Sequence, residues 1–215
     1  MQRYMTTTAE QSATDVYALG RDPGESARLQ RQSEELRPDS ATLLDRVALG
    51  PGQHAIDLGC GPRGILDLLA EMVRLAKPGG WVASLEPDVE GALCHPAHPA
   101  YTRMWELFRA AFGRNGADLL IGRRLAELYR QGGLHDIGIE ARARVCQPAD
   151  SRRTIGPDLV RSLHPVIVSL GLADQGELDA LDRAVRAHLD DPRTLVMPHL
   201  SFLAWGRKPA ARSHE

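Results

Sequence analysis

A glycine-rich loop between two apolar segments constrains this chain more than any other feature. Residues 55–58 read Ala-Ile-Asp-Leu, which predicts a short buried strand, and residues 65–75 carry apolar residues at helical spacing. Three glycines, Gly59, Gly61 and Gly64, stand in the turn between them. Glycine permits positive φ and lets the backbone approach a ligand with no Cβ in the way. The stretch therefore predicts strand, ligand-binding loop and helix, with backbone N–H groups suited to a polar or anionic ligand.

The glycine spacing alone fits the G-x-G-x-x-G fingerprint of dinucleotide-binding loops. Glu86 lies about 20 residues after the last of these glycines, at the end of the next predicted strand, where such a site places the acid that binds a ribose. This pattern predicts an NAD(P)-dependent oxidoreductase. Asp57 at the strand end and Cys60 inside the loop favour a different family.

The run Asp57-Leu58-Gly59-Cys60-Gly61 resembles motif I of the class I S-adenosylmethionine-dependent methyltransferases. The turn Lys77-Pro78-Gly79-Gly80 is similar to the turn before that family's fifth strand, and the apolar segment 200–208, ending in Gly-Arg-Lys, is similar to its antiparallel seventh strand. The small-molecule branch, which includes ubiquinone/menaquinone-type and natural-product enzymes, is the most similar. The resemblance implies that the loop wraps the methionine part of S-adenosylmethionine. It thereby implies as cofactor-binding residues Asp57, Gly59, Cys60, Gly61 and Gly64.

The segment before the loop predicts two helices, at 25–36 and 41–47, with Pro38 ending the first and Ser40 capping the second. In the resembled family the helices in this position cover the cofactor, and a Gln on them can contact it. Gln32 is the cofactor-contacting candidate by position, and packing or plain exposure is the alternative for it.

The chain departs from the family in one large respect. A full class I methyltransferase has three more strands between the motif I helix and the Lys-Pro-Gly-Gly turn, and these carry the acid that holds the cofactor ribose. Here the helix after Gly64 runs directly into that turn. A natural short form and an in-frame deletion both fit. Glu86 is the candidate that substitutes for the missing ribose acid, because a charge-assisted hydrogen bond to a ribose hydroxyl stabilises binding by about 1.5–3 kcal/mol.

The expected fold is α/β: a Rossmann-like methyltransferase fold with a reduced, mostly parallel sheet, an antiparallel last strand and helices on both faces. The strands are predicted at Ala55, Trp81, Ile137 and Leu200, and helices are predicted at 121–130, 154–170 and 175–189. Residues 1–50 form a tail and cap helices, and residues 51–215 form the α/β domain with a helical insertion at about 154–190. A sheet with fewer strands exposes the edge beside its first strand, and exposed edges pair, so a homodimer is expected.

Composition excludes several classes of function. The formal net charge of the 215 residues is −2, and no basic patch interleaved with aromatic residues occurs, so nucleic-acid and membrane binding are not expected. Three widely spaced cysteines predict neither a disulfide framework nor a metal site. No apolar run of signal-peptide or membrane-spanning length is present, and a cytoplasmic protein is expected.

Methyl transfer from a sulfonium is an in-line displacement in which orientation supplies much of the rate. A general base is needed only for a protonated nucleophile. No catalytic residue is therefore assigned, and the possible bases, His95, His98, His164 and His199, have no spacing that singles one out. The predicted function is methyl transfer from S-adenosylmethionine to a small organic molecule. A degenerate, non-catalytic fold that acts as an interaction module is the alternative, and an NAD(P)-dependent oxidoreductase is less favoured.

Overall fold

The computed structural model describes residues 23–50, 53–55, 64–114 and 118–211. Its main sheet has the strand order β1-β5-β3, formed by β1 (Trp81–Asp88), β5 (Leu200–Arg207) and β3 (His135–Ala143). β5 pairs antiparallel with both neighbours, with Ala204 opposite Ser84 on one side and Ile139 on the other. The predicted antiparallel last strand is confirmed, and the prediction of a mostly parallel sheet is wrong for the described residues.

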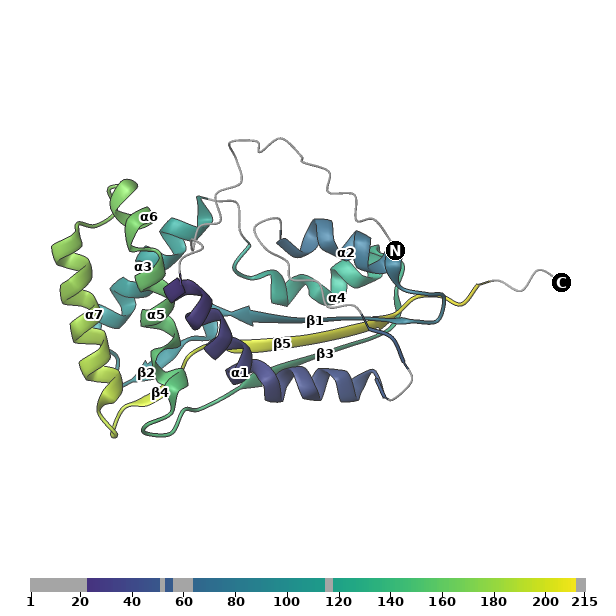
Figure 1. The fold of residues 1–215 in the computed structure, drawn as a ribbon, viewed down its shortest axis with the longest axis horizontal. Helices are drawn as coiled ribbons and strands as arrows, with labels where there is room; N and C mark the ends of the chain where they lie inside the picture. The colour runs from purple at the N-terminus through teal and green to yellow at the C-terminus, as the bar shows by residue number, and fades with distance from the viewer. Residues whose placement is uncertain (1–22, 51–52, 56–63, 115–117, 212–215) are drawn as a thin grey trace, which may run out of the picture.

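The position of the last strand, β5, explains why the main sheet is antiparallel. β1 and β3 run in the same direction, as expected for strands joined by a helical crossover, but they do not pair. β5 lies between them and runs the opposite way, so every ladder of this sheet is antiparallel (Figure 1). The strand predicted at Ala55 stays a prediction, since residues 53–55 are in no strand and residues 56–63 lie outside the described residues.

Helices cover both faces of the sheet, as predicted. α4 (Ile121–Gln131) and α2 (Gly64–Leu75) lie on one face, and α1 (Pro23–Arg46) lies on the other (Figure 1). The α4 face buries an apolar cluster in which Leu125 and Ala204 have no exposed area. A hydrogen bond of 2.7 Å between the hydroxyls of Ser84 and Tyr129 joins β1 to α4 inside this layer. On the other face, ion pairs join α1 to β3.

One continuous helix replaces the two helices predicted before the loop. α1 runs from Pro23 to Arg46 with Pro38 inside it. A proline inside a helix removes one backbone hydrogen bond and commonly kinks the helix. Figure 1 shows α1 changing direction along its length. Packing of α1 against the sheet, where Asp39 is buried, outweighs the local signal that proline gives.

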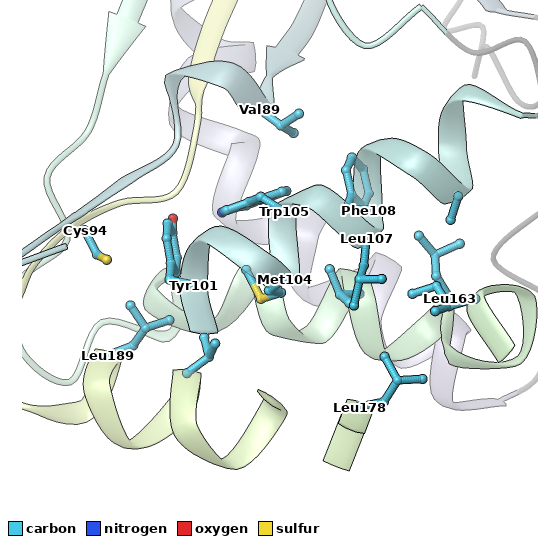
Figure 2. Close-up of a cluster of buried hydrophobic side chains, with 14 of the residues drawn as sticks. Val89, Cys94, Tyr101, Met104, Trp105, Leu107, Phe108, Leu163, Leu178 and Leu189 are labelled. Atoms are coloured by element: carbon cyan, nitrogen blue, oxygen red, sulfur yellow. The ribbon is translucent and has the colours of Figure 1, made fainter. Parts of the chain in front are cut away.

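A second core lies beside the sheet, among α3 (Pro99–Gly113), α5 (Ile155–Ser162), α6 (His164–Ser169) and α7 (Gln175–Asp190). A small antiparallel pair, β2 (Leu93–His95) and β4 (Leu195–Met197), and two 3-10 turns, η2 (Val89–Gly91) and η3 (Ser151–Thr154), close it. Figure 2 shows Trp105 and Phe108 of α3 among the side chains of this core. The helix predicted from 154 to 170 is divided at Leu163, because α6 begins at His164 and has Pro165 in its first turn, where proline is favoured. Among the described helices, none combines the length and apolarity needed to cross a membrane.

The Lys-Pro-Gly-Gly turn fastens α2 to the sheet. Gly79 has φ +74°, and its N–H donates to the carbonyl of Lys208 at 3.0 Å, while Lys208 N–H donates back to Gly80 at 2.8 Å. The Lys208 ammonium donates to the carbonyl of Ala76 at 2.8 Å, at the carboxyl end of α2. A cation at that end stabilises a helix. The direction of α2, and hence where its amino end lies, is therefore fixed by the end of β5.

Candidate functional site

The carboxyl end of β1 is the candidate functional site. In Figure 1 this end and the amino ends of α2 and α4 lie on the same side of the sheet, toward α3 and α5. Ligands of open α/β sheets bind in the crevice outside the carboxyl ends of strands, close to helix amino ends. The residues expected to contact a ligand are therefore the last residues of β1 and the first residues of α2 and α4.

Asp88 is the last residue of β1 and has no exposed area. Its Oδ2 accepts a hydrogen bond of 2.5 Å from Nε of Arg123 in the first turn of α4. Its Oδ1 accepts a hydrogen bond of 2.9 Å from the backbone N–H of Glu90 and caps η2. A buried carboxylate is tolerated only when it is paired in this way. Asp88 thus fixes the start of α4 and the turn η2 to the end of β1.

Arg123 carries this connection to the protein surface. Its side chain keeps 48% of its area exposed although its partner is fully buried. The hydrogen bond that Arg123 donates to Asp88 is the first cause that raises the pKa of the Arg123 guanidinium, and the nearby charge of Glu90 adds to it. Glu90 in turn accepts a hydrogen bond of 3.2 Å from Arg109 of α3. Two carboxylates and two guanidiniums therefore surround the end of β1, a polar wall suited to hydrogen bonding with a ligand.

Glu86 lies on the same face of β1 as Asp88. It stands opposite Phe202 in the ladder with β5, and directly opposed residues share a face. Phe202 faces α4, because a Cβ added to Gly122 would lie 2.7 Å from its ring. The half-buried carboxylate of Glu86 is therefore on the α4 side, two positions before the wholly buried Asp88.

The other predicted cofactor residues are distributed differently. Gly64 is the first residue of α2, as the loop-then-helix pattern predicts. Gln32 is partly buried and belongs to the first half of α1, whereas the ion pairs that join α1 to the sheet come from Asp39 and Arg46 in its second half. Asp57, Gly59, Cys60 and Gly61 lie outside the described residues. The structure thus places Glu86 and the amino end of α2 on the same face of the sheet.

Three of the histidines considered as general bases either cap a helix or are affected by burial. Nδ1 of His98 accepts a hydrogen bond of 3.2 Å from Ala100 N–H and caps α3, and its ring stacks on His188 at 4.6 Å. Burial lowers the pKa of His164 and of His199. Within the ranges that the structure describes, no three His, Cys, Asp or Glu side chains come together as a metal site would require.

Sequence reasoning pointed to Glu86 but missed Arg123. Arg123 and Asp88 are 35 residues apart. Nothing in the local sequence Ile-Gly-Arg-Arg tells which arginine faces β1, because this depends on the rotation of α4 against the sheet. The burial of Asp88 is the signal that reveals the pair, and burial is visible only in the structure.

The comparisons with known proteins identify a similar protein that is named for methyl transfer. No family model matches the chain. Over 157 residues the chain is 29% identical to a protein named N-methyltransferase tcpN from Claviceps purpurea (strain 20.1), with 69% of this chain and 53% of that protein covered. The chain spans about half the length of the curated relative that it matches.

Proposed function

We propose that the chain takes part in methyl transfer from S-adenosylmethionine to a small organic molecule. The similarity to N-methyltransferase tcpN over 69% of this chain carries the proposal. The position of Glu86 supports it, because a half-buried carboxylate stands near the carboxyl end of β1 on the face that also bears α2 and α4. The resemblance of residues 57–61 to motif I is a third and separate support.

The described residues fit part of such a cofactor. Glu86 is an acceptor for ribose hydroxyls, and the amino end of α2 at Gly64 offers backbone N–H groups to the polar methionine part. S-adenosylmethionine, when bound, supplies a methyl group that its sulfonium has already activated. The loop from Gly59 to Gly64 is proposed to hold the methionine part, as in the family that it resembles.

The task of this chain is then mainly orientation. A rigid wall at the end of β1 is what in-line transfer needs, and orientation alone lowers such barriers by several kcal/mol. Asp88 supplies the rigidity, since it holds both Arg123 and the turn at Glu90. We propose a nitrogen atom as acceptor, following the name of the relative. A neutral nitrogen attacks with its own lone pair and needs no general base.

Replacing Glu86 tests the cofactor role. A Glu86→Gln variant loses a charge-assisted hydrogen bond, which weakens binding by about ten- to a hundredfold. Titration calorimetry with S-adenosylhomocysteine measures this change. Glu127→Gln is the matched control, because Glu127 lies on the exposed side of α4, away from the end of β1, and pairs with Arg130. Equal affinity in the wild type and in Glu86→Gln would refute the role of Glu86.

A degenerate fold without catalysis is the second candidate. The three-stranded main sheet of the described residues favours it. Cofactor binding separates the two proposals. A folded chain that binds neither S-adenosylmethionine nor S-adenosylhomocysteine would leave an interaction module as the function.

A further inference from the structure

β3 is the terminal strand of the main sheet in the part of the chain that the structure describes. β3 pairs with β5 along one side only, through His135 and residues 138–143. Ile139, in the middle of β3, keeps 40% of its area exposed. An unpaired strand edge with an exposed apolar residue is a template for pairing with another strand.

The sequence of β3 is self-complementary. Glu140 and Arg142 face α1, where they form ion pairs with Arg46 at 2.6 Å and Asp39 at 3.4 Å. Two copies of β3 that pair antiparallel about Ala141 place each Glu140 opposite the Arg142 of the other copy. On the α4 face the same register places each Ile139 opposite the small side chain of Ala143. Opposite charges in directly opposed positions stabilise a pair of strands.

Neighbouring symmetric registers are less favourable. Pairing about Glu140 or Arg142 places two like charges directly opposite each other, which is destabilising. Pairing about Ile139 requires residues 135–137 in a regular ladder, but the register with β5 is irregular between His135 and Gly138 and Asp136 has φ +50°. The register about Ala141 uses only the regular part of the strand.

We propose that a second copy of this chain docks on the β3 edge, antiparallel and in register about Ala141. The two sheets then join as β1-β5-β3-β3-β5-β1. The new Glu140–Arg142 contacts extend ion pairs that already exist with α1, so no charge loses its partner on docking. This edge differs from the edge beside the predicted first strand, which lies outside the described residues.

Charge reversal tests the surface. Sedimentation velocity of the full chain is expected to show a dimer, and Glu140→Arg or Arg142→Glu is expected to weaken dimerisation by at least about tenfold, since two attractive contacts become repulsive. The double variant Glu140→Arg/Arg142→Glu restores complementarity and the dimer. Glu127→Arg, an exposed reversal on α4, is the matched control and leaves the dimer intact. A monomeric wild type, or single reversals that leave the dimer unchanged, would overturn the proposal.

An engineered disulfide between the two copies tests the register of the β3 strands without altering Glu140 or Arg142. Directly opposed Cα atoms in antiparallel strands are about 4.5–5.5 Å apart, within disulfide range. In a Cys60→Ser background, Ala141→Cys is expected to cross-link on oxidation. Ala143→Cys is the control, because in this register its two copies lie about 13 Å apart. Cross-linking at both positions, or at neither, would overturn the register.

Discussion

Arg153 holds together the last helix and the small sheet. It is 5% exposed, and its guanidinium donates to the carbonyls of Leu189 at 2.6 Å and Thr194 at 2.8 Å. It also donates to Asp191 at 3.0 Å and Cys146 at 3.2 Å. These carbonyls lie at the end of α7 and on the segments that flank β4. The carboxyl end of a helix carries a partial negative charge that favours a cation there.

We expect Arg153→Met to lower the free energy of unfolding by about 3–5 kcal/mol. Each hydrogen bond from a charged donor contributes about 1.5–3 kcal/mol, and a buried carbonyl left without a donor adds its own cost. The desolvation of the guanidinium, which the variant no longer needs, offsets part of this sum. Lysine keeps the charge but lacks the planar guanidinium, so Arg153→Lys is expected to lower the free energy of unfolding by about half as much as Arg153→Met.

Thermal unfolding followed by circular dichroism measures the change, with an expected fall in the Tm of about 6–20 °C for a chain of this size. Arg193→Met is the matched control, because Arg193 pairs with Asp191 on the same segment but is 88% exposed. Its Tm is expected to stay close to that of the wild type. A Tm of Arg153→Met equal to that of the control would refute this account of the buried guanidinium.

Two further predictions concern packing and pH. Gly138→Ala is expected to lower stability by about 1–3 kcal/mol, because its Cβ would lie 2.2 Å from the ring of Trp205, whereas Gly113→Ala, which has nothing within 4 Å, is expected to be neutral or stabilising. Urea denaturation checks both, and equal changes would contradict the packing argument. Burial raises the pKa of Tyr101 from 10 to about 12, so the folded state retains the phenolic proton and stability falls as the pH rises between these values. Tyr101→Phe removes this slope from a plot of Tm against pH, and an unchanged slope would show that another group is responsible.

Local patterns predicted most of the secondary structure. The strand at Trp81, the helices at Ile121 and Gln175 and the antiparallel last strand are where the sequence placed them. Each has a strong period and clear ends, such as the glycines after α4 and Asp174 as the cap of α7. These signals involve neighbours in sequence, which a single sequence contains.

Pairing and burial could not be predicted in the same way. The position of β5 between β1 and β3 depends on contacts more than 50 residues apart, so the mostly parallel sheet was inferred by analogy and was wrong. The continuity of α1 through Pro38 depends on its packing against the sheet. The buried Asp88 and its bond to Arg123 depend on how α4 is rotated. In each case contacts between residues far apart in the sequence determine the structure, and the local sequence does not predict these contacts.

Titration calorimetry of the folded chain with S-adenosylmethionine and S-adenosylhomocysteine tests the proposed function most directly. Micromolar binding of both, weakened in Glu86→Gln and unchanged in Glu127→Gln, is the result that the account predicts. NADH and NADPH serve as competing probes in the same cell. Absence of S-adenosylmethionine and S-adenosylhomocysteine binding by a chain whose circular dichroism shows it to be folded, or binding of a nicotinamide dinucleotide alone, would contradict the account.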